Sequence, residues 1–349
     1  MKTKNREKKS KLNIAIIGAS GYTGSEVTKL LLKHPMVKIG LLVGEKNSGK
    51  KIDEIFKQFI GVKLPTIKSF NEKNLNSVDV IFSCMPSGSL SLIIDRFPKN
   101  KVIIDLSADF RFKDRKLYKS YYNLDYNDNF SKKFVYGLTE INRTAIKKNK
   151  LISCPGCYPT SVLLPIIPLI KSKLIKKTGI IIDAKSGISG AGRNIKEELL
   201  FTENYNSVKA YGNNNHRHTP EMEHNLFLTT KIKTLLSFTP HLIPINRGIM
   251  STIYVKGDAK KIHNELIKNY NKEKFVKVSP FSEVPKISDV TGSNLCRIGV
   301  MGNRRNEYVT IISVIDNLLK GASGQAVQNM NAIFNFPEEL GLDQLSICP

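Results

Sequence analysis

The segment LNIAIIGASGYTGSEV, residues 12–27, carries the strongest fold signal in this chain. Its apolar, β-branched beginning predicts a buried parallel strand over 12–17, and helical spacing of apolar residues follows over 25–33. A second strand is predicted at 37–43. Glycines between a strand and a helix permit a tight turn, and the helix N-terminus attracts phosphate. The pattern predicts a dinucleotide-binding loop that consists of Gly18, Ser20, Gly21, Tyr22, Thr23 and Gly24.

Strands and helices continue to alternate after this unit, with further strands predicted at 78–82 and 102–106. After Cys154 the pattern changes: a helix is predicted at 160–170 and a strand at 180–184. Later strands alternate less regularly with helices, and they are predicted at 233–238, 250–255, 296–300 and 308–315. A last helical stretch follows 320–324. The fold class is therefore α/β, a Rossmann-type doubly wound parallel sheet plus a second α/β domain with a mixed sheet.

Composition excludes several classes of protein. The 349 residues include 54 Lys and Arg against 30 Asp and Glu, a formal net charge of +24. The lysines are spread along the chain without a nucleic-acid motif, so specific nucleic-acid binding is not expected, although a basic nucleic-acid-binding protein remains the non-enzyme alternative. No apolar run reaches the ~18–20 residues that span a bilayer, and no secretory signal is apparent. Five Cys in so long a chain indicate a reducing compartment, and we expect a cytoplasmic protein.

A candidate nucleophile lies in SCPGCYPT, residues 153–160. Pro159 suits the first turn of a helix, which places Cys157 at the helix N-terminus, where the pKa of a thiol is lowered. Cys154 and Cys157 are not expected to bind a metal, because no second Cys pair exists. We interpret Cys154 as incidental, although it could form a disulfide with Cys157 under oxidation.

A candidate acid–base group lies in NHRHTPE, residues 215–221. A Cys nucleophile needs a nearby imidazole to accept and return a proton. We prefer His218 for this role and keep His216 as the second choice. Glu221 is predicted to orient one of the two rings.

Three further segments suit anionic ligands: 107–111 after a predicted strand, the Gly/Ser-rich loop 186–193, and 244–248. Ser186 and Gly187 are predicted to contact the cofactor. The residues predicted to bind the substrate are Arg111, Ser153, Ser189, Arg193 and Arg247.

The end of the second strand reads GEKNSGKK, residues 44–51. An acidic residue there accepts the ribose hydroxyls of NAD, whereas hydroxyls and cations accommodate the 2′-phosphate of NADP. Ser48, Lys50 and their neighbouring lysines outweigh Glu45 if its carboxylate points away. We therefore predict NADP(H) as the cofactor.

Taken together, these segments closely resemble the N-acetyl-γ-glutamyl-phosphate reductase family, type 1, of arginine biosynthesis. The resemblance runs in order along nearly the whole chain. It rests on GASGYTGSEV (18–27), SADFRF (107–112), YGLTEINR (136–143), CPGCYPT (154–160), DAKSGISGAGR (183–193), HRHTPEME (216–223), PHLIPINRGI (240–249) and KGASGQAVQNMN (320–331).

The resemblance implies the NADPH-dependent reduction of N-acetyl-L-glutamyl 5-phosphate to N-acetyl-L-glutamate 5-semialdehyde plus phosphate. Cys157 would form a thioester, the HRHTPE segment would carry the acid–base His, and Gly321 and Gly324 would approach the cofactor. The resemblance implies a homodimer or homotetramer, and it implies no metal.

The implied domains are a basic tail (1–11), an NADP-binding Rossmann domain (12–155), a catalytic and oligomerisation domain (156–319) and a C-terminal helix returning to the Rossmann domain (320–349). Two related activities remain alternatives: aspartate-semialdehyde dehydrogenase and a lysine-pathway acyl-phosphate reductase.

Overall fold

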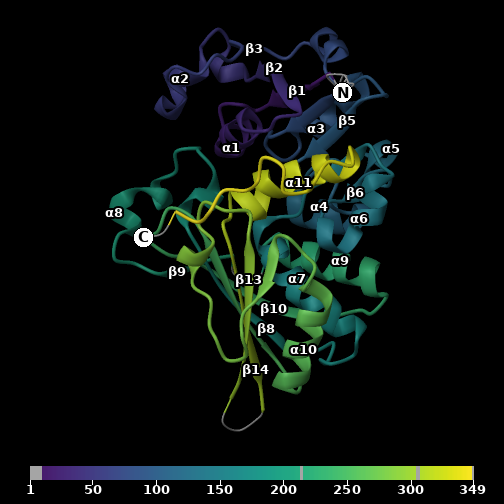
Figure 1. Ribbon diagram of the computed structural model, residues 1–349, viewed down its shortest axis with the longest axis vertical. Coiled ribbons are helices and arrows are strands. Elements are labelled where there is room, and N and C mark those ends of the chain that lie inside the picture. The colour runs from purple at the N-terminus through teal and green to yellow at the C-terminus, as the bar shows by residue number, and fades with distance from the viewer. Residues whose placement is uncertain (1–9, 213–214, 304–306, 348–349) are drawn as a thin grey trace, which may run out of the picture.

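The computed structural model describes residues 10–212, 215–303 and 307–347. Most of the predicted basic tail lies outside these ranges. Figure 1 shows two sheets at opposite ends of the molecule, with helix α11 (Gly324–Ile333) between them. In the described ranges, no helix combines the length and apolar character needed to cross a bilayer.

The first sheet is seven-stranded and entirely parallel, in the order β3-β2-β1-β4-β5-β7-β6. Its strands are β1 (Leu12–Ile17), β2 (Val37–Val43), β3 (Ile67–Lys68), β4 (Val80–Ser83), β5 (Val102–Asp105), β6 (Val135–Tyr136) and β7 (Leu151–Ser153). Its helices are α1 (Tyr22–Leu32), α2 (Ile52–Ile55), α3 (Ser89–Ile93), α4 (Arg115–Tyr122), α5 (Asp128–Ser131) and α6 (Thr139–Lys147). The strand order reverses between β1 and β4, which is where doubly wound sheets bind their ligands. The predicted Rossmann-type sheet is confirmed.

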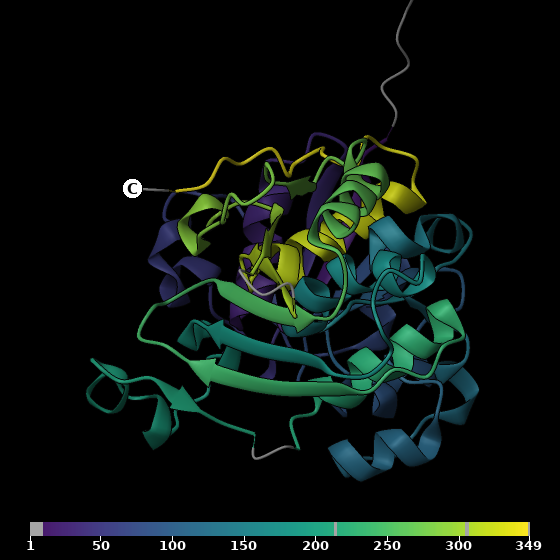
Figure 2. The ribbon, with the colours of Figure 1, turned by 90° about the horizontal axis from the view of Figure 1, so that it is seen from below.

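The second sheet is also seven-stranded but mixed, in the order β12-β13-β14-β11-β8-β10-β9. Its strands are β8 (Ile180–Ser186), β9 (Lys209–Ala210), β10 (Leu236–Leu242), β11 (Ile249–Val255), β12 (Val276–Val278), β13 (Cys296–Gly302) and β14 (Val309–Ile315). Helices α7 (Cys157–Lys171), α9 (His218–Thr230) and α10 (Ala259–Tyr270) pack on one face, as Figure 1 shows. Figure 2 shows α8 (Phe201–Asn204) projecting from the side of the sheet where β9 is the edge strand. The predicted mixed sheet is confirmed.

Helix α7 forms the centre of the second core, and its side chains from Tyr158 to Ile170 are buried. It contains Pro165 and Pro168, which remove helical hydrogen bonds. Because Pro168 has no N–H, the Leu164 carbonyl lacks its usual helical donor. The hydroxyl of Tyr270 on α10 donates to that carbonyl instead. Helix packing therefore compensates for a proline that would otherwise weaken the helix carrying Cys157.

Candidate active site

Cys157 begins helix α7, and Gly156 is the residue at its N-terminal cap. Only a short turn separates the end of β7 from Cys157, so Cys157 lies at the carboxyl edge of the first sheet. The glycine loop after β1 lies at the same edge. Gly321 packs against it: a Cβ at Gly321 would lie 2.9 Å from the Cβ of Cys157. The structure thus brings the predicted nucleophile to a predicted cofactor-contacting residue.

Three side chains hold the turn that precedes Cys157, and we call Arg111, Tyr136 and Glu221 the turn clamp. One Glu221 carboxylate oxygen accepts hydrogen bonds from the Gly156 N–H and the Tyr136 hydroxyl, both at 2.8 Å. The other oxygen lies 3.0 Å from Arg111 Nη1. Arg111 Nε also donates to the Cys154 carbonyl at 2.9 Å. Both sides of the turn are therefore fixed.

The contacts of Glu221 in the turn clamp differ from its predicted role of orienting a histidine ring. The carboxylate is fully buried, and both oxygens are engaged by groups other than an imidazole. The physical reason is the buried guanidinium of Arg111, because a buried charge requires a counter-charge. Glu221 therefore positions the turn before Cys157 and does not orient a histidine ring.

The two histidines differ in their relation to the turn. A Cβ at Gly156 would lie 2.5 Å from His218 Nε2, so this ring packs directly against the residue preceding Cys157. His216 Nδ1 accepts the backbone N–H of His218 at 3.1 Å and so supports the start of α9. Its ring makes edge contacts with Tyr211 and Phe238. The geometry favours His218 as the acid–base group.

Burial changes the charge states expected from the sequence. It raises the pKa of the Cys157 thiol, against the opposing effects of the Tyr158 N–H and the Arg111 charge. Burial, followed by the charges of His216 and Arg217, brings the pKa of His218 well below its ordinary value. The prediction of a lowered thiol pKa is therefore wrong, because desolvation outweighs the helix N-terminus. Thiol and imidazole are both neutral near pH 7.

This charge state predicts how Cys157 reacts with an alkylating reagent. Only the thiolate reacts, and its fraction grows with pH up to the raised pKa. The rate of iodoacetamide labelling should therefore keep rising above pH 9, which can be followed by mass spectrometry of the Cys157 peptide. The buried Cys154 and Cys296, whose pKa values burial raises to about 12, serve as internal controls that should label later. A labelling rate that levels off at or below pH 7 would contradict this prediction.

The glycine loop has the shape that a pyrophosphate requires. Gly18 has φ +84°, and a Cβ there would lie 2.4 Å from the Cys84 carbonyl oxygen. A Cβ at Gly24 would lie 2.3 Å from the Gly18 carbonyl oxygen, so this glycine lets α1 pack on the loop. Gly21, at the cap of α1, has only the Gly18 oxygen within contact distance. The backbone at Gly21 is thus open to a ligand, and these residues fit a bound dinucleotide.

The loop 186–193 lies beside the glycine loop. Arg193 Nη1 donates to the Ser20 carbonyl at 3.1 Å, and its guanidinium lies over the Phe56 ring. A pocket of about 240 Å³ lies between Tyr22 and this loop, with Ser189 in its wall. Two segments predicted to contact cofactor and substrate are therefore neighbours.

The remaining predicted residues have well-defined surroundings. Ser186 is buried and donates to the Gly187 carbonyl, while a Cβ at Gly187 would meet the Asn246 carbonyl at 2.7 Å. The Ser153 side chain is buried, and its hydroxyl has no hydrogen-bond partner among the described residues. A Cβ at Gly324 would lie 2.2 Å from Asn294 Oδ1, so this glycine lets the start of α11 approach the loop before β13.

Arg247 has carboxylate partners within the protein. Its guanidinium lies 3.1 Å from Glu26 on α1 and 3.1 Å from Asp316 after β14. These contacts join the first sheet's helix to the second sheet. Arg247 is therefore an ion-paired bridge between the two halves.

The end of β2 supports the predicted cofactor preference. Glu45 Oε1 accepts the Phe70 backbone N–H at 2.7 Å, which turns this carboxylate toward the neighbouring loop. Ser48 and Lys50 are exposed. The condition set from the sequence, that Glu45 points away, is met by this hydrogen bond.

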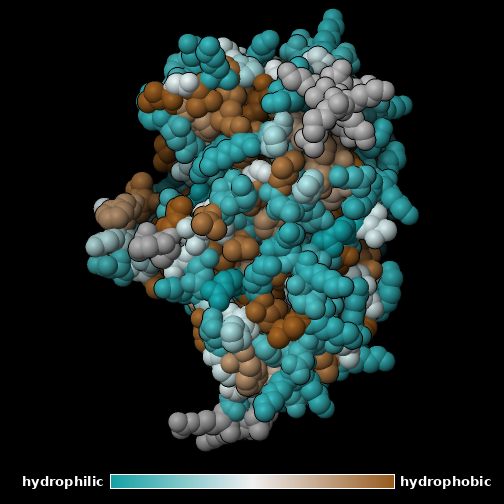
Figure 3. Space-filling view, in the orientation of Figure 1, coloured by the Kyte–Doolittle hydropathy of each residue, from teal (hydrophilic) through white to brown (hydrophobic). Residues whose placement is uncertain are grey.

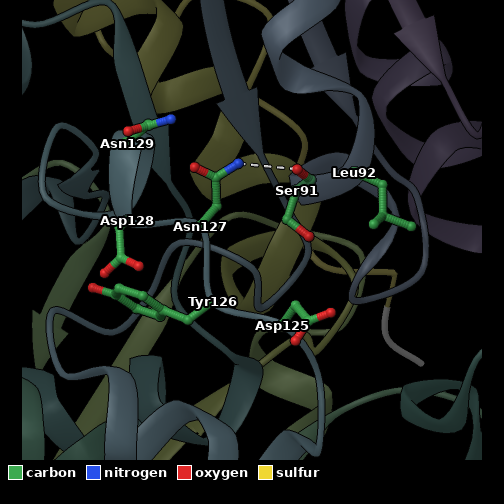
Figure 4. A pocket seen from close by; sticks show the side chains of 7 residues that line it. All are labelled: Ser91, Leu92, Asp125, Tyr126, Asn127, Asp128 and Asn129. Atoms are coloured by element: carbon green, nitrogen blue, oxygen red, sulfur yellow. Dashed lines mark hydrogen bonds between the residues drawn. The ribbon is translucent and has the colours of Figure 1, made fainter.

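A second pocket, of about 390 Å³, lies beside the segment 107–111, since its lining residue Ser91 donates its N–H to Asp109. Figure 4 shows its lining and the hydrogen bond from the Asn127 amide to the Ser91 carbonyl, at 3.0 Å. It contains none of the residues predicted from the sequence. Cys154 lies in the turn before Cys157, but its free, buried sulfur accepts a 3.7 Å hydrogen bond from Asn329.

Sequence reasoning missed Tyr136, Tyr122 and the charge of Arg217. Tyr136 lies in the quoted YGLTEINR segment, but nothing local reveals that its hydroxyl meets a carboxylate 85 positions later. For Arg217, the available signal was its position in the sequence between the two candidate histidines, His216 and His218. These groups become visible only when α4, β6 and α9 meet.

Known proteins match this chain over nearly its whole length, including the site described above. A model described as semialdehyde dehydrogenase, NAD binding domain, matches residues 13–149, and one described as semialdehyde dehydrogenase, dimerisation domain, matches residues 157–317. A probable chloroplastic N-acetyl-gamma-glutamyl-phosphate reductase of Arabidopsis thaliana is 44% identical, over 95% of this chain and 84% of the relative. An N-acetyl-gamma-glutamyl-phosphate reductase of Afipia carboxidovorans is 45% identical, over 96% of this chain and 98% of the relative.

Solved structures share the fold at low sequence identity. Aspartate semialdehyde dehydrogenase II of Vibrio cholerae, crystallised with ASA, has a TM-score of 0.71 at 16% identity and covers 94% of this chain and 99% of its own. Aspartate semialdehyde dehydrogenase of Candida albicans, crystallised with NADP, has a TM-score of 0.67 at 16% identity, over 93% and 99%.

Proposed function

This chain belongs to the N-acetyl-gamma-glutamyl-phosphate reductase family, and on that premise we propose that it reduces N-acetyl-L-glutamyl 5-phosphate to the 5-semialdehyde and phosphate, with NADPH as reductant. The observation that carries the proposal is Cys157 at the start of α7, held by the turn clamp, with Gly321 packed against Cys157 and His218 packed against the preceding Gly156. Such a constrained thiol beside a neutral imidazole suits acyl transfer.

We propose that Cys157 attacks the acyl carbon as its proton passes to His218, and that the phosphate leaves with its bonding electron pair to give a thioester. A neutral imidazole can accept this proton directly, so no preformed thiolate is needed. When bound, the nicotinamide supplies the hydride that reduces the thioester. The proton held by His218 then returns to sulfur as the C–S bond breaks and the aldehyde departs. The Tyr158 N–H, which acts on the Cys157 thiol, supports an oxyanion-stabilising role for the α7 N-terminus.

NADP(H) is the proposed cofactor. The glycine loop would hold the pyrophosphate, and Ser48 and Lys50 would accept the 2′-phosphate. The carboxylate of Glu45 accepts the Phe70 N–H and points away from the expected position of the ribose, which supports NADP over NAD. We propose that the substrate is bound by Arg111, Ser153, Ser189, Arg193 and Arg247. To bind it, Arg247 would have to release its carboxylate partners Glu26 and Asp316.

We also propose the domain division at 155/156 and 319/320, and a homodimer or homotetramer in the cytoplasm. The match of residues 157–317 to a dimerisation-domain model supports assembly. So do the exposed side chains of Ile195, Phe201, Tyr205 and Val208. Figure 3 shows hydrophobic side chains projecting at the position of α8.

The proposed activity predicts a clear substrate preference. In the aldehyde-oxidising direction, with phosphate and NADP, kcat/KM should be at least about 10²-fold higher for N-acetylglutamate semialdehyde than for aspartate semialdehyde. The reaction is followed by NADPH absorbance, and NAD in place of NADP tests the cofactor. A preference for aspartate semialdehyde would support the alternative activity, and salt-sensitive DNA binding without NADPH turnover would support the non-enzyme alternative.

A further inference from the structure

We propose that Arg217 and Tyr122 form a binding site for an oxyanion of the substrate, beside the turn that carries Cys157. The inference deepens the proposed function and rests on it. The substrate has two such groups: the carboxylate at the end away from the reacting carbonyl, and the phosphate that leaves. The ligand chemistry is the same for both, and the experiment below separates them.

Arg217 is placed to recognise an anion. It lies between His216 and His218 in the chain, at the N-terminal cap of α9, and its side chain is exposed. Its Cζ lies 5.9 Å from the centre of the Tyr122 ring. No carboxylate of the described ranges forms an ion pair with it, whereas Arg111 and Arg247 each have one. Its charge therefore remains available to a ligand.

Tyr122 offers a donor that the fold leaves unused. It ends α4, and its hydroxyl is buried without a hydrogen-bond partner among residues 10–212, 215–303 and 307–347. The ring is held in place by stacking on Tyr118 at 5.1 Å and by an edge contact with Phe112 at 5.8 Å. A buried, unpaired hydroxyl carries a free-energy cost that a ligand oxygen would relieve. Burial also raises the pKa of Tyr122 to about 12, so the group remains a donor at working pH.

The pair lies within the electrostatic surroundings of the nucleophile. The charges that act on the Tyr122 hydroxyl include Glu221, Arg111 and Arg217, and the same three act on the Cys157 thiol. Because Glu221 is bound to Arg111 within the turn clamp, Arg217 is the one of these two cations that has no carboxylate partner in the part of the chain that the structure describes. Its neighbour His218 packs on Gly156, so an anion on Arg217 would be held close to the reacting groups.

The test uses Arg217→Met and Tyr122→Phe in the full-length protein, assayed in the aldehyde-oxidising direction. The first removes the charge but keeps an extended apolar side chain, and the second removes only the hydroxyl. We expect Arg217→Met to raise KM for one anionic substrate by about 10- to 100-fold and Tyr122→Phe to raise the same KM by about 10-fold. KM for NADP should not change. Arg217→Lys should recover part of the loss.

Arg115→Met is the matched control. Arg115 is an exposed arginine on α4 paired with Asp128, and its replacement should leave every KM unchanged. A raised KM for the semialdehyde assigns the site to the carboxylate, and a raised KM for phosphate assigns it to the phosphate. If neither KM moves, or if Arg115→Met has the same effect, the inference is overturned.

Failure of the proposed function would look different, because the wild-type protein would then be inactive on N-acetylglutamate semialdehyde. In that event calorimetric titration with N-acetylglutamate and with inorganic phosphate decides the inference. Binding to the wild type that Arg217→Met abolishes supports the site. Equal binding to both proteins, or no binding to either, overturns it.

Discussion

Replacing Cys157 by serine is expected to lower kcat for NADPH-dependent reduction of the acyl phosphate by about 10³-fold or more. A serine hydroxyl at the start of α7 is a much weaker nucleophile than the thiol, and the neutral His218 is too weak a base to ionise it. The measurement is NADPH oxidation at saturating substrate. The melting temperature should stay near that of the wild type, since the replacement removes only a sulfur of intermediate exposure.

Cys154→Ser provides the matched control, three residues earlier in the same turn. Its buried sulfur packs in the first core and accepts a 3.7 Å hydrogen bond from Asn329, which a serine hydroxyl can also accept, so the effect on activity should be small. The same variant tests the oxidation hypothesis, because inactivation by peroxide should become slower if Cys154 and Cys157 form a disulfide. A Cys157→Ser enzyme with wild-type activity would exclude the proposed thioester.

Glu221→Gln is expected to have the largest effect on stability. The change keeps the shape of the side chain but leaves the Arg111 guanidinium buried without its counter-charge, which costs about 3–5 kcal/mol of unfolding free energy. Loosening the turn should also lower kcat by about 10²-fold, as misplacement of a reacting group by about 1 Å does. Urea unfolding and steady-state kinetics measure the two effects.

Two further variants separate charge from general disruption. Glu223→Gln lies two residues along the same helix, where the carboxylate accepts only the Leu236 N–H, and it should cost far less. Adding Arg111→Met to Glu221→Gln removes the unpaired charge, so much of the lost stability should return while kcat stays low. The turn clamp would be refuted if Glu221→Gln and Glu223→Gln were equally stable and equally active.

Local patterns were sufficient for most of the first sheet and for the helix of the nucleophile. The apolar run of β1 and the segment 37–43 have the predicted bounds, because buried parallel strands are continuous apolar runs. The strand predicted at 233–238 instead spans Leu236–Leu242, because pairing with β8 overrides the proline and histidine in its second half. Helix α10 was not predicted, and its Tyr270 hydroxyl compensates for a proline in α7.

By itself, the sequence determined the family, the two-sheet architecture and the position of Cys157, since each depends on residues that are close together in the chain. Only the tertiary structure decided what surrounds that cysteine. Burial, which depends on the whole fold, raises the thiol pKa and lowers that of His218. Likewise, the partner of Glu221 proved to be Arg111, 110 positions away, because a buried carboxylate pairs with the cation that folding brings to it.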